Sequence, residues 1–192
     1  MLDLPTRKPN RLKNYDYSQN GVYYVTICTK KHAELFGCFC RGDRPGRPFM
    51  INTNTQETKG THPYIELNEW GKCVDTSIRT VNNKNNAIKI QKYVIMPNHI
   101  HLIIAICSKT NAGRSKKRAT ESVAPTICGV VRNIKSYVSK KMGETVWQKS
   151  FHDHIIRDND EYERIAEYIE NNPAMMWEDD CYCCRKKRNS RW

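Results

Sequence analysis

The chain has 192 residues, of which 32 are Lys or Arg and 20 are Asp or Glu, so its formal net charge at pH 7 is +12. This length suits one substantial core with appended loops and would be cramped for two domains. The excess of positive charge favours a polyanionic partner, with nucleic acid as the first candidate. A membrane surface is disfavoured, because the basic residues are scattered and do not line one amphipathic helix.

Hydropathy and cysteine usage indicate a cytoplasmic protein with no membrane partner. No stretch approaches the length of a transmembrane span, and residues 1–13 are charged without an apolar signal core. The cysteines number nine, an odd count that is typical of reduced thiols in a chain with no export signal. A zinc site made from Cys38 and Cys40 with Cys181, Cys183 and Cys184 remains an alternative, although the CxxC spacing typical of zinc ribbons is absent.

The first half of the chain predicts a strand, a long loop and a helix. Residues 21–29 are dense in β-branched and aromatic residues, as strands are. Residues 38–65 are rich in Gly, Pro, Thr and Asn, which indicates short edge strands around a long loop. Asn68 can cap a helix that ends at the Asn-rich residues 82–86, and one face of that helix should pack on the sheet. The face consists of Trp70, Val74, Ile78 and Val81.

The most informative segment is residues 96–106, Met-Pro-Asn-His-Ile-His-Leu-Ile-Ile-Ala-Ile. Pro97 and Asn98 suit the centre of a tight turn, so residues 88–96 should pair antiparallel with residues 99–106. His99 and His101 are two residues apart in a strand and therefore project from the same face. Burying both imidazoles is costly unless each finds a partner, so we predict a metal or catalytic role for the pair.

The second half predicts a basic loop, a helix, a strand and a final helix. Residues 107–125 have no apolar period and read as a phosphate-contacting loop or a solvated linker. Thr126 should begin a helix that ends at Gly143, with Tyr137 at the edge of its buried stripe. Residues 147–157 resemble a strand with a second histidine pair, His152 and His154, on one face. The predicted buried stripe of the helix that Thr126 begins is Ile127, Val130, Val131, Ile134 and Val138.

The order of these elements predicts an α+β fold, a ferredoxin-like antiparallel sheet with packed helices. We expect a last helix capped by Asp158 or Asn159 and ending at residues 171–173, because Pro173 cannot continue the hydrogen-bond ladder. Residues 1–177 would form one domain with long loops at about 41–64 and 107–125, and residues 178–192 a basic, Cys-rich tail.

Several segments resemble the HUH single-tyrosine transposases, and among them the REP-associated tyrosine transposases of the IS200-like group. They follow the family's order and span most of residues 11–177. The segments are residues 11–29 (Arg-Leu-Lys-Asn-Tyr-Asp-Tyr-Ser-Gln-Asn-Gly-Val-Tyr-Tyr-Val-Thr-Ile-Cys-Thr), Leu67-Asn-Glu-Trp-Gly71, Met96-Pro-Asn-His-Ile-His-Leu102, Lys135-Ser-Tyr137, Trp147-Gln148, Phe151-His-Asp-His-Ile-Ile-Arg157 and Tyr168-Ile-Glu-Asn-Asn-Pro173.

The resemblance implies a domain that binds single-stranded DNA hairpins of repetitive palindromic elements, cuts beside them and rejoins strands, with a homodimer as one expected assembly. His99 and His101 match the family's metal pair for Mg²⁺ or Mn²⁺, and Tyr137 matches the nucleophile that forms a 5′-phosphotyrosine link. Related transposases often take a third ligand one turn beyond the tyrosine. That position here is Lys141, which has no lone pair to give.

Further candidates and alternatives follow from the same residues. His154, or His152 beside it, is a candidate third ligand, and Lys141 could instead neutralise a phosphate. The predicted DNA contacts are Lys116, Lys117, Arg118, Arg132 and Lys141. If Tyr137 is not the nucleophile, Tyr162 and Tyr168 on the last helix are next in line. A hairpin-binding protein of the same fold without cleavage activity is the alternative function.

Overall fold

The computed structural model describes residues 19–40, 63–84, 87–107 and 126–178, and the statements below concern these residues. Four strands form one antiparallel sheet in the order β4-β5-β1-β6: β4 (Ile88–Ile95), β5 (His99–Ile106), β1 (Gly21–Cys28) and β6 (His152–Ile156). Helix α1 (Glu69–Lys84) lies between β1 and β4 in the chain, and α2 (Ile127–Met142) lies between β5 and β6. This order and direction of strands confirm the α+β, ferredoxin-like prediction.

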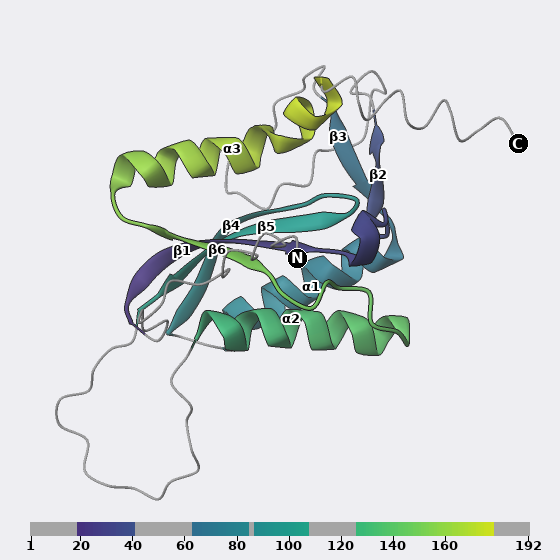
Figure 1. Cartoon of the computed structure of the whole chain (residues 1–192), viewed down its shortest axis with the longest axis horizontal. Coiled ribbons are helices and arrows are strands. Elements are labelled where there is room, and N and C mark those ends of the chain that lie inside the picture. The colour runs from purple at the N-terminus through teal and green to yellow at the C-terminus, as the bar shows by residue number, and fades with distance from the viewer. Residues whose placement is uncertain (1–18, 41–62, 85–86, 108–125, 179–192) are drawn as a thin grey trace, which may run out of the picture.

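The two faces of the sheet carry different helices (Figure 1). Helices α1 and α2 lie side by side on one face, and α3 (Asn159–Glu178) crosses the other. Because side chains alternate along a strand, Val25 and Ile27 face α1 and α2 whereas Tyr24 and Thr26 face α3. The sheet thus separates two sets of residues that are close in sequence.

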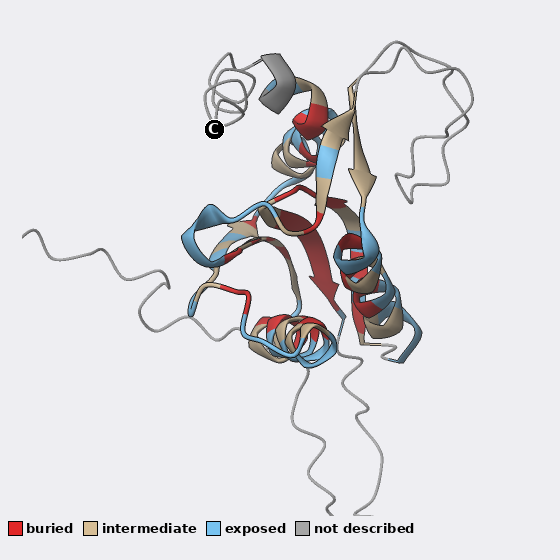
Figure 2. Ribbon diagram, turned by 90° about the vertical axis from the view of Figure 1, so that its right-hand side faces the viewer, coloured by how far each residue is buried: buried red, intermediate tan, exposed pale blue. Residues whose placement is uncertain are grey.

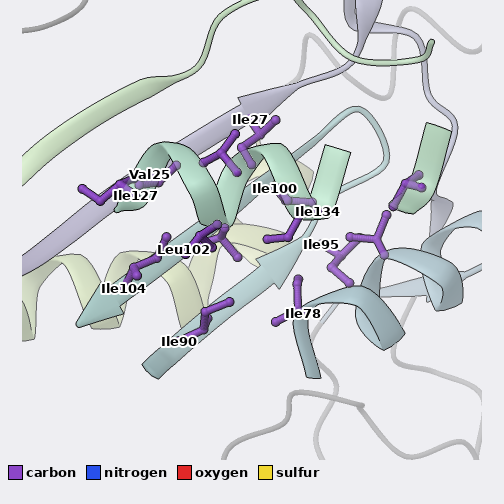
Figure 3. Packing of buried hydrophobic residues seen from close by; sticks show 14 of the residues in the cluster. Val25, Ile27, Ile78, Ile90, Ile95, Ile100, Leu102, Ile104, Ile127 and Ile134 are labelled. Carbon is purple, nitrogen blue, oxygen red and sulfur yellow. The ribbon is translucent and has the colours of Figure 1, made fainter. Parts of the chain in front are cut away.

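The larger core lies between the sheet and helices α1 and α2. Ile100, Leu102 and Ile104 of β5 pack there against the apolar stripe of α2, as Figure 3 shows. Figure 2 shows buried residues concentrated in the sheet and on the inner faces of the helices. The smaller core on the α3 side includes Ile103 and Ile169.

Helix ends follow the predicted caps. The Asn68 side chain accepts hydrogen bonds from the backbone of Trp70 and Gly71, at 3.0 and 2.9 Å. Thr126 caps α2 by accepting from Gly129 N, and Gly143 ends it with a φ of 75°, a left-handed conformation that glycine adopts without strain. The five predicted stripe residues of α2 are buried.

A separate two-stranded ribbon follows β1. Strand β2 (Gly37–Cys40) pairs antiparallel with β3 (Tyr64–Leu67), beside the end of α3 in Figure 1. Gly37 is needed where the strands meet, since a Cβ there would lie 2.4 Å from the Glu66 carbonyl oxygen. The predicted edge strands are therefore present, while residues 41–62 lie outside the described part of the chain.

Two predicted boundaries are wrong. Strand β6 begins at His152 rather than at Trp147, which makes only an isolated bridge to Thr29. Helix α3 continues through Pro173 to Glu178 instead of ending at residues 171–173. Asn172 and Pro173 are both buried, so packing of this turn offsets the hydrogen bond that proline cannot donate. At the other end of α3, Asp158 provides the cap by accepting from Glu161 N.

Candidate functional site

The two predicted histidines converge on the α3 face of the sheet. His99 and His101 project from β5 with their Nε2 atoms 3.0 Å apart, and their rings meet edge to face. His101 is buried and His99 is partly buried. Two ring nitrogens at this separation present their lone pairs, or one lone pair and one N–H, to a common point.

The Nδ1 atoms of both rings have oxygen partners. His99 Nδ1 lies 2.6 Å from Asn98 Oδ1, and because an amide oxygen only accepts, Nδ1 donates and Nε2 keeps its lone pair. His101 Nδ1 contacts the Tyr24 hydroxyl at 2.7 Å and Thr26 Oγ1 at 2.9 Å. Hydroxyls donate and accept, so they are compatible with the tautomer in which Nε2 of His101 is also free. Such partners fix the ring orientation of histidines that bind metals.

Burial keeps both imidazoles neutral at pH 7. Burial, with a smaller effect of nearby His32, lowers the pKa of His99 to about 4. Burial and the neighbouring His99 lower the pKa of His101 to about 3. Burial likewise raises the pKa of Tyr24 to about 12, so its hydroxyl stays protonated and orients His101.

The turn before the histidine strand is held by the segment after β1. The carbonyl oxygen of Pro97 accepts from the backbone N–H of Leu35 and Phe36, at 2.8 and 3.0 Å. The carbonyl oxygen of Asn98 accepts from Thr29 N at 2.9 Å. These bonds fix where β5 begins and so where the histidine pair stands.

A basic turn lies beside the pair. Residues Lys30–His32 form one 3₁₀ turn, in which Lys31 and His32 have positive φ angles of 55° and 53°. A positive φ angle is unfavourable for residues other than glycine, and strained residues of this kind cluster at functional sites. Both lysines are exposed, and His32 lies close enough to His99 to contribute to lowering its pKa. The turn therefore presents positive charge next to the histidines.

Tyr168 of α3 faces the histidine pair across the interface between the helix and the sheet. Its ring meets His101 edge-on, with centroids 5.5 Å apart, and meets Tyr24 at 6.5 Å. The side chain is 40% exposed, so solvent or a ligand reaches it. Tyr168 is thus a tyrosine that touches a histidine of the pair and remains open to a substrate.

Asn172 lies one helical turn beyond Tyr168, on the same face of α3. It is 1% exposed, and its Oδ1 atom has no hydrogen-bond partner among the described residues. An unpaired buried amide oxygen is costly and calls for an explanation. The other two such atoms belong to Trp147 and Asp153, which face the α1 and α2 side of the sheet. Among the residues that the structure describes, Asn172 is therefore the one buried side chain on the histidine side with an unpaired polar atom.

The structure does not bring Tyr137 to the histidines. Tyr137 is on α2, which packs on the opposite face of the sheet through Ile134 and Val138. Lys141, on the same helix, lies close enough to Cys73 of α1 to lower the pKa of that thiol, although burial raises this pKa by more. Arg132 is exposed on α2 as well. The prediction that Tyr137 reaches the pair from the following helix therefore fails, because the sheet lies between them.

The second histidine pair, His152 and His154, lies on one face of β6 as predicted, but His154 contacts a residue other than the histidines of β5. His154 lies on the α3 face opposite Tyr24, but its Nε2 is 2.7 Å from Glu161 Oε1, on α3. His154 is thus engaged away from the Nε2 atoms of His99 and His101. His152 is exposed, opposite Thr26. The predicted DNA contacts Lys116, Lys117 and Arg118 lie outside the described residues.

A local signal for Tyr168 and Asn172 exists in the sequence. A tyrosine followed four residues later by asparagine places a hydroxyl and an amide oxygen on one helix face. Tyr137 followed by Lys141 does not. The supporting roles of Tyr24 and Thr26 have no comparable signal, because they depend on which strand pairs with β5.

Comparison with known proteins identifies the family of this chain. A sequence model of the family described as "Transposase IS200 like" matches residues 58–172, more than half of the chain. The chain belongs to the IS200-like transposase family. The match includes the histidine pair, Tyr168 and Asn172. Among the described residues of this transposase, no helix has the length and apolar character that crossing a membrane requires.

Of the individual proteins compared, one has no assigned role and two are solved structures with low sequence identity to this chain. A protein of uncharacterised function from Haemophilus influenzae strain Rd is 33% identical over 186 residues, which covers 91% of each chain. A solved structure of a REP-associated tyrosine transposase bound to a REP hairpin has a TM-score of 0.49 and 17% identity, over 86% of this chain and 74% of that one. A proposed transposase from Deinococcus radiodurans R1 has a TM-score of 0.38 and 14% identity, over 84% and 95%.

Proposed function

We propose that this transposase cleaves and rejoins single-stranded DNA with Tyr168 as the nucleophile, beside a divalent cation held by His99, His101 and Asn172. The observation that carries the proposal is the contact between Tyr168 and His101 on the α3 face. The proposal replaces Tyr137 with Tyr168 and keeps the histidine pair.

The three proposed ligands fit a divalent cation by their chemistry. Two neutral imidazole nitrogens stand 3.0 Å apart, and a buried amide oxygen without a partner lies on the same side of the sheet. The family's expected one-turn spacing from the tyrosine, which fails at Lys141, is met at Asn172. A bound Mg²⁺ or Mn²⁺ would polarise the scissile phosphate and neutralise its charge. Mixed nitrogen and oxygen ligands suit Mn²⁺ and permit Mg²⁺.

The reaction assigned to Tyr168 conserves the phosphodiester bond energy. Its phenolic oxygen attacks phosphorus after losing its proton, the bond from phosphorus to the 3′ oxygen breaks, and that oxygen takes up a proton. The products are a 5′-phosphotyrosine link and a free 3′-hydroxyl. A 3′-hydroxyl from another strand end can reverse the step, so rejoining needs no ATP.

The substrate class proposed is a single-stranded DNA hairpin such as a repetitive palindromic element. A net charge of +12 supports binding of a polyanion. The exposed Lys30 and Lys31 beside the histidines offer phosphate contacts close to the reacting groups. Because Tyr168 and the pair meet within one chain, the proposal does not require a dimer.

The test is covalent capture of DNA. Labelled hairpin oligonucleotides are incubated with Mn²⁺ or Mg²⁺ and the protein, and adducts are counted on a denaturing gel. Tyr168→Phe keeps the ring and its packing but removes the attacking oxygen, so the adduct should disappear while hairpin binding changes little. The wild type treated with EDTA should behave in the same way.

Tyr137→Phe is the matched control, since it makes the same chemical change on the opposite face of the sheet. It should form the adduct at the wild-type level. An adduct that persists in Tyr168→Phe and is lost in Tyr137→Phe would overturn the assignment. Cleavage without any adduct in the wild type would identify a hydrolytic nuclease, and hairpin binding without cleavage would identify a binding protein.

A further inference from the structure

The β2–β3 ribbon gathers two thiols and a carboxylate on one of its faces. Cys38 and Cys40 are two residues apart in β2 and therefore point to the same side. Glu66 of β3 is the direct cross-strand partner of Cys38. Phe39 and Ile65 point the other way and pack into the small core beneath α3.

The spacing of the three side chains is that of a metal site. The two sulfur atoms and a carboxylate oxygen of Glu66 all lie within 4.8 Å of one another. Cys40 Sγ is 3.5 Å from Glu66 Oε2. With Zn–S and Zn–O bonds of about 2.3 and 2.0 Å and tetrahedral angles, two such ligand atoms stand about 3.5 Å apart. One edge of the tetrahedron is therefore already formed.

The electrostatics of the cluster favour a cation. Burial, then the Glu66 carboxylate, and then the Cys38 thiol raise the pKa of the Cys40 thiol. Glu66 and Cys38 therefore oppose a negative charge on Cys40. A bound cation reverses this effect, because it stabilises both thiolates and the carboxylate together.

We propose that Cys38, Cys40 and Glu66 bind a zinc ion, with water in the fourth position. Thiolate ligands select a soft or borderline cation over Mg²⁺ or Mn²⁺, so this site is distinct in its chemistry from the histidine pair. On binding, the two thiol protons leave and two Zn–S bonds and one Zn–O bond form. No oxidant or reductant is involved.

The ion would fasten the two strands of the ribbon to each other. A two-stranded ribbon is marginally stable by itself, and the chain connects these two strands through the long segment of residues 41–63. Because Phe39 and Ile65 pack in the same core as Ile169 of α3, a firmer ribbon also supports the helix that carries Tyr168. The site is thus structural rather than catalytic.

The test is metal analysis of the full chain in a His99→Ala/His101→Ala background, where the imidazole pair cannot contribute. Protein purified with a reductant, given equimolar ZnCl₂ and dialysed, should retain about one zinc per chain by plasma mass spectrometry. The added substitution Cys38→Ser/Cys40→Ser should abolish retention, and Glu66→Gln should weaken it. Co²⁺ in place of zinc should show a thiolate charge-transfer band that the serine variant lacks.

Two controls keep the result specific. Cys73→Ser, on α1 and away from the ribbon, should retain zinc, as should serine substitution of Cys181, Cys183 and Cys184. Chelation should lower the melting temperature of the parent protein and leave that of Cys38→Ser/Cys40→Ser unchanged. Zinc retained by the ribbon variant, no zinc in the parent, or a native mass showing a Cys38–Cys40 disulfide would overturn the proposal.

Discussion

At the scale of single residues, the chemistry of the site depends on groups that hold the histidines rather than on the histidines alone. Tyr24 contributes twice to His101, since its hydroxyl contacts Nδ1 at 2.7 Å and its ring stacks on the imidazole with centroids 5.4 Å apart. Thr26 adds a second oxygen at Nδ1. Both come from β1, the strand hydrogen-bonded to β5, so sheet pairing itself positions the site.

Tyr24→Phe is expected to weaken Mn²⁺ binding by about 10-fold, the lower end of the range for losing such a partner, because Thr26 still contacts His101. Isothermal titration of the metal-free protein with Mn²⁺ measures the affinity directly. The stacked ring is retained, so the fold should be preserved in the circular dichroism spectrum.

Tyr93→Phe is a matched control. It removes a hydroxyl that donates to Asp75 at 2.6 Å, and that bond joins β4 to α1 on the other face of the sheet. It should lower the free energy of unfolding by about 1 kcal/mol and leave Mn²⁺ affinity unchanged. Equal effects of the two variants on Mn²⁺ affinity would show that Tyr24 acts only through overall stability.

At the scale of elements, helix α1 packs so closely against the backbone at Phe36 that one position of the helix has no room for a side chain. A Cβ on Gly71 would lie 2.1 Å from the carbonyl oxygen of Phe36, a backbone atom that cannot rotate away. The segment that bears Phe36 also holds the turn before His99, through the hydrogen bond from Phe36 N to Pro97 O. Helix packing and site geometry are therefore connected through this backbone.

Gly71→Ala should destabilise the protein by about 1–3 kcal/mol, the usual range for overpacking, although alanine is the better helix former. Gly129→Ala provides the comparison, because a Cβ in that position of α2 meets only Thr126 Oγ1 at 3.5 Å. Its stability should equal or exceed that of the wild type. Urea unfolding of both variants checks the difference, and equal stability of the two would show that α1 moves freely.

Local patterns in the sequence account for most of the elements and for half of the candidate site. Alternation in β1 and β5, the stripe of α2 and the caps at Asn68, Thr126 and Gly143 were predicted, because each depends on neighbours in the chain. The position of Tyr168 rather than Tyr137 beside the histidines was not, since both helices are amphipathic and periodicity does not say which face of the sheet a helix covers. The continuation of α3 through Pro173 likewise depends on burial that no local pattern reveals.

At the scale of the whole molecule, the two predicted DNA contacts that the structure describes, Arg132 and Lys141, lie on the opposite face of the sheet from the candidate site. Arg132 and Lys141 are exposed on α2, whereas Lys30 and Lys31 are exposed in the turn beside His99. A DNA strand that reaches Tyr168 would run along the face of the sheet that α3 covers. The net charge of +12 attracts DNA from any direction, but the contacts that position it should come from the turn.

The salt dependence of hairpin binding tests this directly. The slope of log affinity against log salt is negative, and each lost phosphate contact makes it shallower by about 0.7–0.9. Lys30→Ala/Lys31→Ala should therefore make it shallower by about 1.4–1.8. Arg132→Ala/Lys141→Ala removes the same amount of charge and should leave the slope unchanged. Fluorescence anisotropy of a labelled hairpin across a salt series gives both slopes. If only the α2 pair changes the slope, the strand crosses the face covered by α1 and α2, and Tyr137 rather than Tyr168 would stand on its path.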